Sequence, residues 1–119
     1  QMESFRHYPT DLDVISSLGT FFVKQEMYER SLYFFQQALL VQPKEIKWGF
    51  AIASAHKRCG EHDIAFHAYQ KLYDEFPDNE ECLRHLISSC ETLGQSSFKY
   101  QEKLDTLLSQ KAILVTNRM

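Results

Sequence analysis

The sequence is poor in proline, glycine and cysteine, with three, four and three of these residues among 119. So little proline and glycine excludes a collagen-like chain or a flexible linker. The formal net charge of −3 argues against a nucleic-acid partner, because binding phosphates usually needs a net basic face. No apolar run approaches the ~18 residues of a membrane-spanning helix, and no signal-peptide pattern is present. We therefore expect no nucleic-acid binding and no membrane insertion.

The cysteines, Cys59, Cys82 and Cys90, are odd in number and lie inside helical patterns. This usage is typical of reduced, buried thiols in a cytosolic protein. The length corresponds to one domain or to a piece of one. Because the chain begins with Gln1, we expect an excised fragment.

The prolines, Pro9, Pro43 and Pro77, lie 34 residues apart. Large and small residues recur between them at matching positions, with Gly49 and His56 as the poor matches. A period of this length is typical of tetratricopeptide (TPR) repeats, each of which is one helix–turn–helix unit. The sequence thus predicts an all-α fold of TPR hairpins in a right-handed superhelix. The matching positions are Ile15, Leu18, Gly19, Phe22, Ser31, Phe35, Ala38 and Pro43, then Gly49, Ile52, Ala53, His56, Ala65, Tyr69, Leu72 and Pro77.

The same numbering divides the chain into repeats. We assign residues 1–9 to the end of a preceding helix B, 10–43 and 44–77 to two TPRs, 78–112 to a degenerate TPR with a closing helix, and 113–119 to a C-terminal tail. Thr10 and Asp13 are expected to cap the first helix, Asn79 to start the fifth, and Gly60 to provide a left-handed stop. The expected helices span about 12–25, 28–41, 45–59 and 62–76, followed by a pair that starts after residue 79 and near residue 96.

No phosphate-binding loop, nucleophile elbow or zinc-protease motif occurs. His56, Cys59 and His62 could share a metal, and Cys82 and His85 repeat the spacing of the first two. Structural zinc, however, normally has four clearly spaced ligands. We therefore expect no metal, no cofactor, no small-molecule substrate and no enzymatic activity.

A TPR array binds its partners mainly in a concave groove lined by the A helices. In this groove the sequence places a small basic stripe around one aromatic residue. We interpret it as a site for an extended or helical segment, with the aromatic ring as an anchor and the cations setting register. The alternative is a solvated face with one packing aromatic. The asparagines of a carboxylate clamp are missing. The predicted groove residues are Lys47, Phe50, Ser54, Lys57, Arg58 and Arg84.

A second candidate surface is the outer face of the 28–41 helix, where Tyr33 and Phe34 fall outside the core stripe. These adjacent aromatics could form a docking patch. Alternatively, they pack against the neighbouring helix B. Trp48 lies on a different side of its helix from Phe50, and we expect it to be packed between repeats.

Two runs carry a narrower resemblance, QPKEIKWGFAIASAHKRCG at 42–60 and FPDNEECLRHLISSCETLG at 76–94. They resemble the C-terminal TPRs of the polaris family, the large TPR subunit of intraflagellar transport complex B. The resemblance implies a non-enzymatic scaffold that contacts other core subunits of that complex during cilium and flagellum assembly. It also implies a location in the cytoplasm, the cilium or flagellum and the basal body. A TPR adaptor of another cytosolic complex, either a co-chaperone or a ubiquitin-ligase scaffold, is the alternative.

Overall fold

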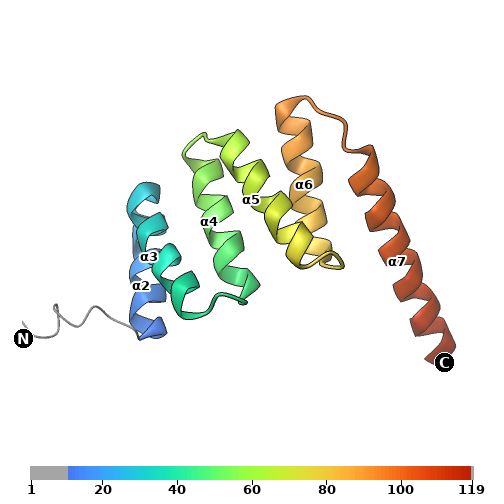
Figure 1. The fold of residues 1–119 in the computed structure, drawn as a ribbon, viewed down its shortest axis with the longest axis horizontal. Coiled ribbons are helices and arrows are strands. Elements are labelled where there is room, and N and C mark those ends of the chain that lie inside the picture. Colours follow the sequence, from blue (N-terminus) through green and yellow to red (C-terminus); the bar gives the residue numbers. More distant parts are fainter. Residues whose placement is uncertain (1–10, 119) are drawn as a thin grey trace, which may run out of the picture. The chain divides into compact units, whose positions relative to one another are not determined.

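A computed structural model describes residues 11–118, which form six α-helices and no strand. The all-α prediction is confirmed. The predicted helix end at residues 1–9 and the predicted cap Thr10 lie outside the described residues. The helices are α2 (Leu12–Lys24), α3 (Tyr28–Val41), α4 (Ile46–Arg58), α5 (His62–Glu75), α6 (Glu80–Leu93) and α7 (Phe98–Arg118) (Figure 1).

Two of the three predicted helix ends are confirmed, whereas the cap of α2 differs from the prediction. Asp11 caps α2 in place of the predicted pair Thr10 and Asp13, since its Oδ1 accepts a hydrogen bond from the Asp13 backbone N–H at 2.9 Å. The Asn79 side chain accepts from the backbone N–H of Cys82 at 2.8 Å, which confirms the predicted start of α6. Gly60 has a φ of 81°, so the left-handed stop after α4 is also confirmed. These caps satisfy backbone groups that a helix end leaves unpaired.

The chain divides within α5 into two compact units, between Ala65 and Phe66. In the first unit α2 packs against α3, and α3 packs against α4. The packing of α2 on α3 needs a small residue at Gly19, because a Cβ atom there would lie 2.7 Å from Cε1 of Phe35. The core of the unit is formed by Ile15, Phe35, Ala38 and Trp48.

Trp48 is buried between the two repeats, as predicted, with 5% of its surface exposed. Its ring stacks on Phe35 at a centroid distance of 6.3 Å. Its indole N–H donates a hydrogen bond to Oε1 of Gln42 at 2.8 Å, so the polar edge of the buried ring is satisfied.

In the second unit α6 packs against α7. Leu83 and Leu86 of α6 and Leu104 and Leu107 of α7 are all buried. α7 runs on to Arg118, so residues 113–118, assigned to a tail from the sequence, are helical. Among the described helices, none has the length and apolar character needed to cross a membrane.

Candidate protein-binding surfaces

Five of the six predicted groove residues lie on α4 and share one side of that helix. The first four are spaced three or four residues apart, one helical turn each, and Arg58 lies four residues after Ser54. Arg84, the sixth residue, lies on α6 in the second unit, where its guanidinium is 3.9 Å from the Glu80 carboxylate. The α4 stripe, as we call the five, consists of Lys47, Phe50, Ser54, Lys57 and Arg58.

Two cations of the α4 stripe are held by aromatic rings. The Lys47 ammonium lies 4.8 Å from the ring centroid of Trp48. The Arg58 guanidinium lies 5.6 Å from the ring centroid of Tyr28 and donates to its hydroxyl at 3.5 Å. Each contact of this kind at an exposed site is worth about 0.5–1 kcal/mol. The rings therefore restrict where the two charges can lie.

Tyr28 has no place in the sequence-based interpretation of the groove. It opens α3, thirty residues before Arg58 in the chain, and the TPR numbering gives that position no role. Its contact with Arg58 joins the start of α3 to the end of α4. Within the stripe, Phe50, Ser54 and Lys57 are half-buried, whereas Lys47 and Arg58 are exposed.

The two aromatic residues predicted for the outer face of α3, Tyr33 and Phe34, have different surroundings. Phe34 is half-buried and stacks on Phe22 of α2 at 5.6 Å, so it packs within its own hairpin. Tyr33 contacts Phe34 edge-on at 5.2 Å and is 46% exposed. Leu40, one heptad after Tyr33 on the same helix, is 74% exposed. Leu40 was not among the predicted surface residues, although its i+7 spacing from Tyr33 places it on the same side of the helix.

The histidines and cysteines considered as metal ligands make packing and hydrogen-bond contacts. His56 Nδ1 lies 2.9 Å from Oε1 of Glu61. The Cys82 thiol donates to the backbone carbonyl of Tyr69 at 3.3 Å, and the ring of Tyr69 stacks on His85 at 4.7 Å. Burial, aided by the charge of Glu81, raises the pKa of Cys82 to about 11. No group of three or more potential metal ligands gathers anywhere in residues 11–118.

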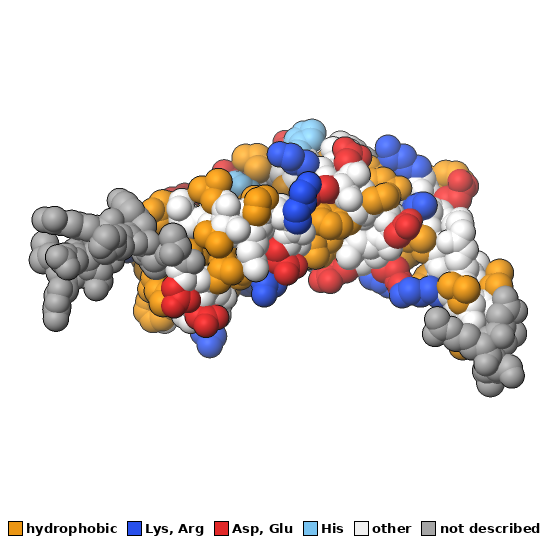
Figure 2. Space-filling model, turned by 60° about the horizontal axis from the view of Figure 1, so that its bottom comes forward, with side chains coloured by type: hydrophobic (Ala, Val, Ile, Leu, Met, Phe, Trp, Pro, Cys, Tyr) orange, Lys and Arg blue, Asp and Glu red, His pale blue; other side chains and the backbone are white. Residues whose placement is uncertain are grey.

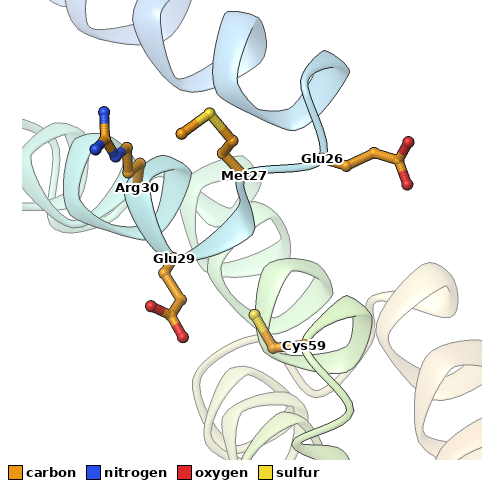
Figure 3. Close-up of a pocket in the computed structure, with 5 residues that line it drawn as sticks. All are labelled: Glu26, Met27, Glu29, Arg30 and Cys59. Carbon is orange, nitrogen blue, oxygen red and sulfur yellow. The ribbon is translucent and has the colours of Figure 1, made fainter.

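An open pocket of about 400 Å³ lies beside the α2–α3 turn and the end of α4 (Figure 3). Desolvation, and to a smaller extent the negative charges of Glu61 and Glu29, raise the pKa of the Cys59 thiol at the edge of this pocket. The thiol is therefore protonated at neutral pH and is a poor nucleophile. The pocket is lined by Glu26, Met27, Glu29, Arg30 and Cys59.

Sequence comparison finds a human relative. The protein named Intraflagellar transport protein 88 homolog is 38% identical over 71 residues, which is 59% of this chain. Over these residues the chain is similar to a member of the polaris family. The predicted resemblance is thus confirmed, over a stretch that spans 9% of the length of the human protein. No protein-family model matches the chain.

Solved structures with the same fold include those of MamA, a TPR-like helical repeat protein. MamA MSR-1 C2 superposes with a TM-score of 0.73 at 18% identity, over 92% of this chain and 64% of that one. A MamA point mutant gives a TM-score of 0.68 at 18% identity, over 85% and 75% of the two chains. At this identity the likeness shows the fold alone, and it confirms the TPR-like architecture.

Proposed function

We propose that the chain belongs to a non-enzymatic scaffold subunit of the intraflagellar transport B complex. The observation that carries the proposal is its 38% identity to the human Intraflagellar transport protein 88 homolog. The TPR-like fold supports it, because stacked helical hairpins present extended surfaces to other proteins. In this role the chain acts in the cytoplasm, at the basal body and in the cilium, and it makes protein–protein contacts during cilium assembly.

The α4 stripe is the surface that we assign to a partner subunit. Phe50 supplies a half-buried apolar anchor, and Lys57 and Arg58 supply positive charge about two helical turns away. Because Arg58 is restrained on the Tyr28 ring, little side-chain freedom is lost when it pairs with a partner. A segment with one apolar side chain flanked by acids fits this surface.

The function is tested by a pull-down from ciliated cells with the whole chain as bait, followed by mass spectrometry. We expect core subunits of the intraflagellar transport B complex among the specific partners. The matched control is the double variant Phe50→Ala/Lys57→Glu, which should recover less of the same subunits while remaining helical. Recovery of chaperones or ubiquitin-ligase components in place of these subunits would favour a TPR adaptor of another complex.

A further inference from the structure

α7 is longer than the helix against which it packs. It has 21 residues, whereas α6 has 14, and the two run antiparallel (Figure 1). At a rise of about 1.5 Å per residue, the difference in length is roughly 10 Å. Lys111 forms an ion pair with Glu80, the first residue of α6. The residues of α7 that follow Lys111 therefore extend past the start of α6.

The apolar stripe of α7 continues into this extension. Leu107 and Leu108 are followed one heptad later by Leu114 and Val115, a spacing typical of a helix face that packs in a bundle. Leu104 and Leu107 are buried, at 8% and 9% exposure. Leu108 is 38% exposed, and Leu114 and Val115 are each 59% exposed. Figure 2 shows hydrophobic side chains gathered at the described end of α7. The side of α7 that is buried near Leu104 and Leu107 therefore continues toward the end of the helix as an exposed apolar surface.

We propose that this uncovered face, the α7 overhang formed by Leu108, Leu114 and Val115, docks an amphipathic helix of a partner protein. The established α6–α7 interface indicates the chemistry of that helix. α6 packs against α7, both helices carry buried aliphatic side chains, and Glu80 of α6 pairs with Lys111. A helix that continues this packing needs an aliphatic stripe flanked by acidic residues.

The charge of α7 supports an acidic partner. After Asp105 the sequence contains no aspartate or glutamate, whereas Lys111 and Arg118 are basic. The Lys111 side chain is 67% exposed although it pairs with Glu80, so one side of its ammonium faces outward. A carboxylate on the partner helix would find positive charge on α7 and no competing acid beyond residue 105.

A second copy of the chain and a lipid surface fit the overhang less well. Stable interfaces use about 20–30 residues a side, and the overhang offers three apolar side chains. Its partner must therefore be a protein that is held by further contacts, as a subunit of an assembly is. A membrane-surface helix has a polar face rich in Lys and Arg. The polar residues of α7 are mixed in charge, because Glu102 and Asp105 lie among Lys99, Lys103 and Lys111.

The proposal rests on the scaffold function, and one binding series separates the two. The whole chain is immobilised, and purified recombinant core subunits of the intraflagellar transport B complex are applied one at a time. Leu114→Asp/Val115→Asp should weaken binding of one subunit about tenfold or more. Ser109→Ala/Gln110→Ala changes two exposed positions of α7 outside the overhang, without altering its charge, and should leave that binding unchanged. Leu114→Ala/Val115→Ala, which keeps a neutral helix, should give an intermediate loss.

Equal binding by all variants, with circular dichroism showing intact helices, would overturn the overhang proposal while the scaffold function stands. If no core subunit bound the parent chain, both proposals would fail. Two further measurements decide the occupant. Concentration-dependent dimerisation in analytical ultracentrifugation that Leu114→Asp/Val115→Asp abolishes would replace the partner helix with a second copy. Co-sedimentation with phosphatidylserine vesicles that the same variant abolishes would replace it with a membrane.

Discussion

The first hairpin and the last helix bury their apolar faces to very different extents. Between α2 and α3 the apolar face is buried, with Ile15 at 2% exposure and Phe35 at 7%, although Leu40 on the outer side of α3 is 74% exposed. In α7 the equivalent face is closed as far as Leu107 and open at Leu114. A repeat cannot bury its apolar face alone, so the exposed fraction of its apolar side chains indicates whether a neighbouring helix covers them. The end of α7 is uncovered in this sense, and it is the surface to which we assign a partner helix.

The largest expected effect comes from truncating a covered residue of the second unit. Leu86 has no exposed surface, so Leu86→Ala removes buried methyl groups and leaves a cavity. We expect a loss of about 2–5 kcal/mol in the free energy of unfolding. Leu114→Ala on the uncovered face is the matched control and should change it by no more than about 0.5 kcal/mol. Urea titration followed by circular dichroism measures both. Similar losses at the two positions would mean that Leu114 is covered.

Overpacking the small position of the second repeat should have the next largest effect. Ala53 is completely buried, so Ala53→Phe forces its neighbours apart. We expect a loss of ~1–3 kcal/mol or more, which is a large share of the stability of a small domain. Gln110→Phe, at an exposed site, provides the control in thermal melts. An unchanged melting temperature for Ala53→Phe would show that the assigned repeat register is wrong.

A smaller effect is expected from alkaline pH, through the buried thiol of α6. The pKa of Cys82 rises from 9.0 to about 11 on folding, chiefly through burial. Between these values the unfolded chain loses the proton while the folded chain keeps it, so stability should fall as pH rises from 9 to 11. Cys82→Ala should reduce this slope. Urea midpoints at pH 8, 9.5 and 10.5 measure it, and an identical slope in the variant would assign the effect to other groups.

Residues with a fixed backbone role made much of the fold predictable. Asn79 and Gly60 mark helix ends because their side chain or φ angle suits those positions, and both act as predicted. Gly19 was predicted from the repeat period, and its contact with Phe35 gives the physical reason. These signals are local in the chain, or they recur with the repeat.

The surfaces were less predictable, because they depend on side-chain contacts between distant residues. The pairing of Arg58 with Tyr28 depends on how α3 and α4 are placed. Phe34 appeared to point outward, but α3 packs against both α2 and α4 and buries a wider face than the repeat pattern indicates. The helical end of α7 lacks any repeat signal, so the sequence left residues 113–119 as a tail.

The central claim is that the chain binds a partner subunit, and stopped-flow kinetics test it most directly. The chain would be mixed with the core subunit recovered in the pull-down, at low and moderate salt. We expect saturable binding by the parent chain. Phe50→Ala should lose about 1–3 kcal/mol of binding free energy, which appears as faster dissociation. Lys57→Glu/Arg58→Glu should associate more slowly, and its association rate should depend less on salt. Folded variants that both bind like the parent would remove the α4 stripe from the interface. No saturable binding by the parent chain would contradict the scaffold function itself.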